Sequence, residues 1–122
     1  MNPDDHAGPR PALPADSPSA DECLQLLART GVGRIVYTRH ALPVVLPVRF
    51  QLDFSGAVVV AVPAGTGLTE AVDGSIVAFH AEELDPATLR GTSVMAHGRA
   101  EAVDGGTALR IVPQLVTGTV LS

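Results

Sequence analysis

The sequence predicts a mainly β protein, a six-stranded antiparallel split β-barrel with a short N-terminal helix and one small helix between strands. Its apolar residues are mostly Val, Ala and Leu, and only 3% of the chain is aromatic. Small and β-branched side chains of this kind favour strands. Six short apolar segments are separated by turn residues, whereas a parallel α/β fold would need a helix between most strands. The 122 residues fit a single domain.

The ordered domain is expected to span residues 19–122 and to begin with a helix. Ser19 followed by Glu22 fits a capping box, and Gly31 is a suitable helix end. The predicted apolar stripe of this helix consists of Cys23, Leu24, Leu27 and Ala28. Cys23 is the single cysteine, and we interpret it as a buried thiol rather than a nucleophile.

Residues 1–18 contain five prolines and no periodic apolar pattern, so we expect a disordered tail that folding does not need. The N-terminus lacks the apolar centre of a signal peptide, and no apolar run is long enough to span a membrane. A cytoplasmic protein is the expectation. The net charge is −5 and the eight basic residues, all Arg, are dispersed, which argues against a nucleic-acid partner.

The strands are predicted from alternating or continuous apolar runs bounded by turn signals. They cover residues 33–38, 43–53, 57–62, 75–81, 92–103 and 110–121, and residues 68–72 form the small helix. In the second strand the apolar side chains share one face, and Arg49 points the other way. The fifth strand has a small, flat face made of Val94, Ala96, Gly98, Ala100 and Ala102.

Candidate chemical groups are few. His40, His80 and His97 lie on three different elements without metal-ligand spacing, so no metal site is predicted. Arg49 interrupts an apolar strand, and two interpretations stay open: an ion pair on the barrel surface, or a fixed cation for a phosphate. Glycines 65 and 67 precede a helix, as in loops that cradle phosphate, yet the chain contains no lysine.

The ordered set of segments "GVGRIVYT", "PVVLPVRF", "VVVAVPAGTGL", "GTSVMAHGRAEAV" and "RIVPQLVTG" resembles the pyridoxamine 5′-phosphate oxidase-like family of FMN-binding split barrels. The resemblance covers Ser19 to Ser122. It implies a homodimer in which each FMN lies in a groove between two chains, and we expect the flat face of the fifth strand to meet the partner. The residues it places at the cofactor are Val48, Arg49, Val62, Gly65, Thr66, Gly67 and Ser93, and it assigns no catalytic residue.

Three departures from the family pattern bear on FMN. Ala61-Val62 stands where relatives carry Arg-Thr, Gly67 where they carry lysine, and Thr92 where they carry tryptophan. The loss of the lysine and of a neighbouring hydrogen-bond donor is expected to weaken FMN binding on the order of a hundredfold or more. Arg49 then becomes the main remaining cation of an FMN phosphate or ring site, and Gly67→Lys is expected to strengthen FMN binding.

Two functions follow from the resemblance. The first is an oxidoreductase that uses FMN or a deazaflavin and acts on an unknown small-molecule substrate. The alternative is a non-catalytic dimeric split-barrel binding protein whose flavin site is weakened or lost, and which holds haem, a deazaflavin or no ligand.

Overall fold

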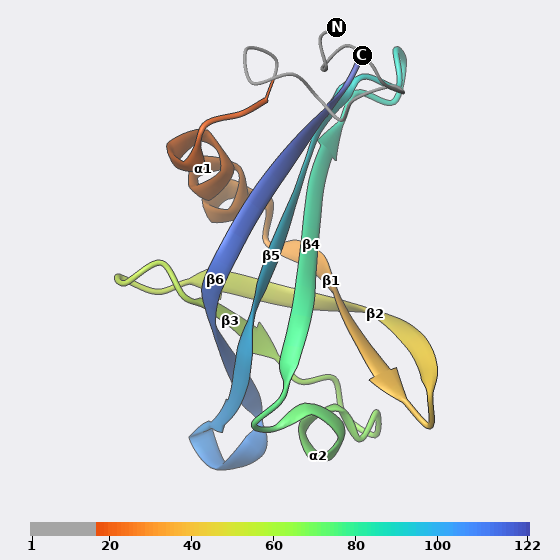
Figure 1. Cartoon of the computed structure of the whole chain (residues 1–122), viewed down its shortest axis with the longest axis vertical. Coiled ribbons are helices and arrows are strands. Elements are labelled where there is room, and N and C mark those ends of the chain that lie inside the picture. The colour runs from red at the N-terminus through yellow and green to blue at the C-terminus, as the bar shows by residue number, and fades with distance from the viewer. Residues whose placement is uncertain (1–16) are drawn as a thin grey trace, which may run out of the picture.

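The computed structural model describes residues 17–122, so residues 1–16 of the predicted tail lie outside it. Six antiparallel strands close into one barrel in the order β1-β2-β3-β6-β5-β4, which confirms the predicted fold (Figure 1). The elements are α1 (Ala20–Thr30), β1 (Val32–Arg39), β2 (Leu42–Leu52), β3 (Val58–Ala61), α2 (Leu68–Val72), β4 (Ile76–Leu84), β5 (Gly91–Val103), a 3₁₀ turn (Asp104–Gly106) and β6 (Ala108–Leu121).

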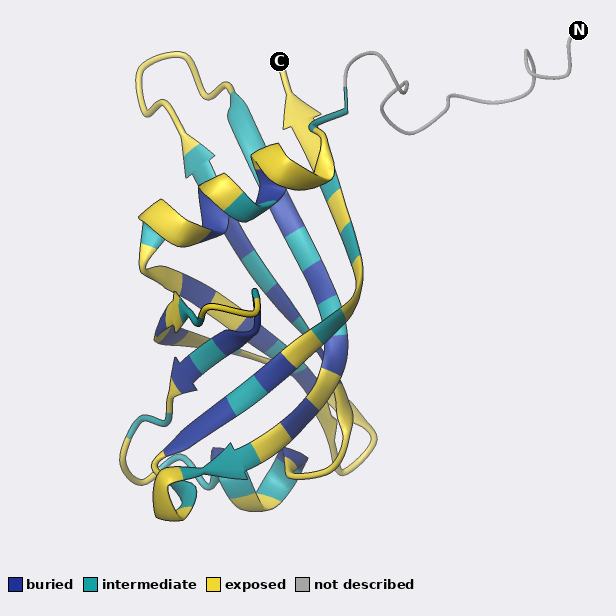
Figure 2. Ribbon diagram, turned by 90° about the vertical axis from the view of Figure 1, so that its left-hand side faces the viewer, coloured by how far each residue is buried: buried dark blue, intermediate teal, exposed yellow. Residues whose placement is uncertain are grey.

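Helix α1 begins and ends as predicted. The Glu22 N–H donates to Ser19 Oγ over 3.1 Å, the Ser19 N–H donates to Glu22 Oε1 over 2.8 Å, and Gly31 caps the C-terminus with a φ of 75°. The predicted stripe is wrong at one position, because Ala28 is exposed while Leu26 is buried. The helix lies across one end of the barrel, where its apolar side covers the strands (Figure 2).

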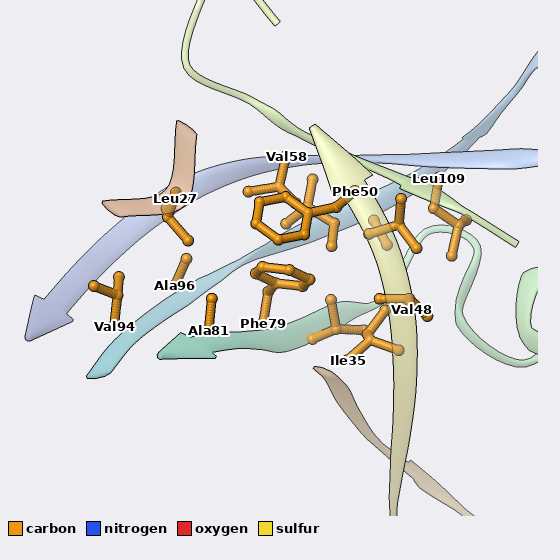
Figure 3. Close-up of a cluster of buried hydrophobic side chains, with 14 of the residues drawn as sticks. Leu27, Ile35, Val48, Phe50, Val58, Phe79, Ala81, Val94, Ala96 and Leu109 are labelled. Atoms are coloured by element: carbon orange, nitrogen blue, oxygen red, sulfur yellow. The ribbon is translucent and has the colours of Figure 1, made fainter. Parts of the chain in front are cut away.

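The core fills the barrel with aliphatic side chains around one aromatic pair (Figure 3). Phe79 is fully buried, and its ring centroid lies 4.6 Å from that of Phe50 in an edge-to-face arrangement. Gly33 of β1 lies against the Phe79 ring, where a Cβ would be 3.1 Å from Phe79 Cε1 and 2.6 Å from the His80 carbonyl oxygen. The interior therefore needs both a large ring and a glycine beside it.

The small face of β5 points into the barrel, not toward a partner. Val94, Ala96 and Ala100 are 0% exposed, and Gly98 is buried. Gly98 lies against β6 of the same chain, where the register shifts and a Cβ would meet Ile111 Cγ2 at 3.2 Å. The expectation that a second copy packs on this face is therefore wrong, because the face is buried inside the barrel of its own chain.

The long β4–β5–β6 sheet gives the molecule two distinct ends (Figure 1). One end carries the loop between β4 and β5, and the other carries α2 and the 3₁₀ turn. Pro18, which the sequence placed in the tail, packs against Gly118 of β6 and is half-buried. In the described part of the chain, none of the helices has the length and apolar character needed to cross a membrane.

Candidate functional site

An apolar groove of about 380 Å³ runs along the outside of the barrel beside β2. Alternation along β2 turns Val48 inward, where it is 3% exposed, and leaves Arg49 outside. The groove is lined by Val32, Pro47, Val48, Arg49, Ala61, Val62 and Pro63. Val48 and Val62 were predicted at the site and do line the groove, while Val32, Pro47 and Pro63 were not foreseen.

Arg49 lies at the rim of this groove, opposite Val32 of β1 in the strand register. It is exposed, and no described residue forms an ion pair or hydrogen bond with its guanidinium. It shares a neighbouring depression with Asp104, yet the two do not pair. Of the two interpretations left open by the sequence, the surface ion pair is therefore absent from the described residues.

The glycine loop forms a second and larger cavity of about 620 Å³. Val62 and Pro63 line both this cavity and the apolar groove, so the two spaces adjoin. Gly65 and Gly67 have φ angles of 78° and 68°, the left-handed region that favours glycine. Thr66 Oγ1 donates to the Pro63 carbonyl over 2.8 Å, which holds the turn closed. The predicted turn with two glycines before a short helix is therefore present in the structure.

Arg39, which sequence reasoning missed, lies at this loop. A Cβ on Gly67 would be 3.3 Å from Arg39 Nη1 and 3.9 Å from Nη2, although the two residues are far apart in the chain. Arg39 ends β1 and pairs with Leu42 across a two-residue turn in which His40 and Ala41 both have positive φ. The predicted strands end at residue 38 and begin at residue 43, so extending each by one residue would have given this hairpin. The sequence did not indicate which loop the hairpin approaches.

Ser93 is not brought to the groove within one chain. It lies on β5 between Glu82 of β4 and Thr119 of β6, two residues from the β5 start. That end of the sheet is opposite the end that carries α2 and the glycine loop (Figure 1). Of the other predicted cofactor residues, Val48, Arg49 and Val62 line the groove, Val62, Gly65 and Gly67 line the loop cavity, and Thr66 lies in the loop between the two glycines.

Neither the groove nor the loop cavity is lined by Cys23, His40, His80 or His97. Burial is the main factor that raises the pKa of the Cys23 thiol, which keeps it protonated and supports its interpretation as a buried thiol. His97 Nδ1 is buried without a hydrogen-bond partner and lines a separate cavity. Within residues 17–122, no three His, Cys, Asp or Glu residues are arranged to hold a metal ion.

Comparison with known proteins places this geometry in a family. The family model described as pyridoxamine 5′-phosphate oxidase matches residues 19–120. The uncharacterized protein Rv0080 of Mycobacterium tuberculosis is 30% identical over 136 aligned positions, which cover 92% of this chain and 89% of the relative.

Solved structures agree with the fold. The FAD binding protein from Mycobacterium smegmatis superposes with a TM-score of 0.76 at 30% identity, covering 87% of this chain and 97% of that one. A FAD-binding protein from Mesorhizobium loti superposes with a TM-score of 0.71 over the same shares at 19% identity, a likeness of fold alone. The match of the family model over residues 19–120 shows that the chain belongs to the pyridoxamine 5′-phosphate oxidase family.

Proposed function

We propose that the protein binds a flavin and works as a flavin-dependent oxidoreductase. The observation that carries the proposal is the junction of two spaces at Val62 and Pro63. One is an apolar groove suited to a flat ring, and the other is a loop cavity bordered by an arginine. A flavin has both parts, a flat apolar ring and a phosphorylated tail. When bound, it would supply hydride or electron transfer.

The chain's own residues would have separate tasks. Pro47, Ala61 and Val62 would contact the ring and exclude water from one of its sides. Arg49, at the groove rim, would direct its positive charge toward the polar edge of the ring. The glycine loop would receive the tail. FMN and FAD both meet this description, and the similar M. smegmatis protein is described as binding FAD.

The same proposal includes a homodimer with the flavin in a groove between the two copies. Val32, which lines the groove, and Val45, farther along β2, are 55% and 57% exposed. A second copy that covers this side would remove these side chains from water. It would also be the source of a Ser93 hydroxyl, because Ser93 lies near the start of β5, at the end of the sheet that carries the β4–β5 loop.

The test is a titration of the purified protein with FMN, FAD and riboflavin, followed by flavin fluorescence, alongside light scattering. We expect saturable binding by a dimer, and Val45→Arg should weaken both dimerisation and binding. Absence of binding by all three flavins would refute the proposal. A protein that binds flavin, but whose bound flavin neither a nicotinamide nor a deazaflavin donor reduces, would instead be the non-catalytic binding protein.

A further inference from the structure

We propose that Arg39, not Arg49, is the cation that binds the phosphate end of the ligand. This inference rests on the flavin function proposed above, and it names a residue for one part of that site. It follows from the position of the guanidinium, from its lack of other partners, and from the way the surrounding loop is held.

The Arg39 guanidinium occupies the space in which a side chain at residue 67 would begin. Both of its terminal nitrogens lie within 4 Å of the Cβ position of Gly67. Gly67 carries no side chain, so the loop backbone leaves this space open to the cavity. The strand β1 thus delivers a positive charge to a loop whose own residues, 62–67, contain none.

The donors of Arg39 are available. Arg29 is bound to Glu83, Arg110 to Asp53, and Arg99 to the Gly74 carbonyl. No described residue forms a hydrogen bond or ion pair with Arg39, so its N–H groups are free for a ligand. A guanidinium presents its donors as a planar fork that matches two oxygens of a phosphate.

The walls of the cavity are fixed before any ligand arrives. Thr69 Oγ1 donates to the Gly106 carbonyl over 2.8 Å, and the Val62 N–H donates to the Thr107 carbonyl over 3.0 Å. The Thr66 and Thr69 hydroxyls are used within the protein, whereas the backbone N–H groups of Gly65 and Gly67 belong to residues that line the cavity together with Arg39. No described residue accepts a hydrogen bond from either.

Glu70 is the acidic residue that lines this cavity, and its negative charge would repel a bound anion. Its side chain is exposed, so solvent screens its charge. An anion is therefore expected on the Arg39 side of the cavity, beside the glycines. Arg49, in contrast, lines the groove and its neighbouring depression rather than this cavity. A phosphate monoester or pyrophosphate, as in FMN or FAD, fits the donors present.

The experiment compares FMN with riboflavin, which lacks the phosphate, in the full-length protein and in Arg39→Ala and Arg49→Ala. Both variants remove one exposed positive charge, so they match in net charge. Arg39→Ala should weaken FMN about tenfold or more and change riboflavin by less than about twofold, since one charged contact to phosphate is lost. Arg49→Ala should weaken both flavins to the same extent. Arg39→Lys should recover part of the FMN affinity, and Glu70→Gln should increase it.

Equal effects of Arg39→Ala on FMN and riboflavin, or no effect on either, would overturn the assignment while leaving flavin binding intact. If neither flavin binds, the proposed function fails, and pyrophosphate becomes the probe. Its addition should then shift the amide NMR signals of Gly65 and Gly67 in the wild type but not in Arg39→Ala. If pyrophosphate does not shift the Gly65 and Gly67 signals of the wild type, the assignment is overturned as well. Thermal unfolding checks that each variant folds. The Tm of Arg39→Ala should be close to that of the wild type, because no described residue forms a hydrogen bond or ion pair with Arg39.

Discussion

Gly67→Lys and Gly67→Ala test whether position 67 can accept any side chain. The family pattern suggested that a lysine there would strengthen FMN binding. The structure predicts the opposite, because Gly67 has a φ of 68° and its Cβ position is 3.3 Å from Arg39 Nη1. A substituted side chain would strain the backbone and force the guanidinium to move.

The magnitude follows from the backbone conformation. Holding a non-glycine residue in the left-handed region costs about 1–2 kcal/mol. For a domain near 100 residues this lowers Tm by roughly 4–16 °C. Gly56→Ala is the matched control, since Gly56 has a φ of 84° and nothing within 4 Å of its Cβ position. Gly56→Ala and Gly67→Ala should therefore lose similar stability, for the same physical reason.

The assay combines thermal or urea unfolding with FMN titration at fixed salt. Gly67→Ala should also weaken FMN, whereas Gly56→Ala, in the β2–β3 turn, should leave affinity unchanged. Gly67→Lys should be less stable than the wild type and bind FMN no more tightly. A Gly67→Lys protein that is as stable as the wild type and binds FMN tenfold more tightly would show that our argument from φ and from Arg39 is wrong.

Three further predictions concern the fold. Phe79→Ala should destabilise the protein by about 3–5 kcal/mol in urea unfolding, because Phe79 is fully buried against Phe50, and a loss below 1 kcal/mol would contradict this packing. Hydrogen bonds from Arg110 and Ser55 hold the pKa of Asp53 well below its usual range. The ionised Asp53 carboxylate therefore stabilises the fold fully above pH ~4, and this stabilisation is lost as the pH falls through the lowered pKa. Asp53→Asn should accordingly flatten the pH dependence of Tm on the acid side, and an unchanged acid slope would argue against the pair. Deleting residues 1–16 should leave Tm within a few degrees of the full chain, as measured by calorimetry.

The sequence alone was enough to predict the elements. Period-two alternation in β2, continuous apolar runs elsewhere and the Ser19–Glu22 capping box are local signals, and each reports the conformation of its own segment. The six strands, both helices and the glycine loop were therefore predictable. The family followed from the order of these segments, and it is confirmed by the match over residues 19–120.

Tertiary structure decided which of these residues meet. The sequence suggested that the small face of β5 is a docking surface, because alternation along a strand does not show which face lies inside the barrel. Closure of the barrel turns this face inward, with β6 beside it. The family pattern places both Ser93 and the glycine loop at the cofactor. Within one chain, however, Ser93 lies near the β5 start, at the end of the sheet opposite the end that carries α2 and the glycine loop before it. Arg39 reaches Gly67 only because the β1–β2 hairpin packs beside the loop before α2. Such contacts depend on long-range strand register, a property of the closed barrel that no local pattern of residues encodes.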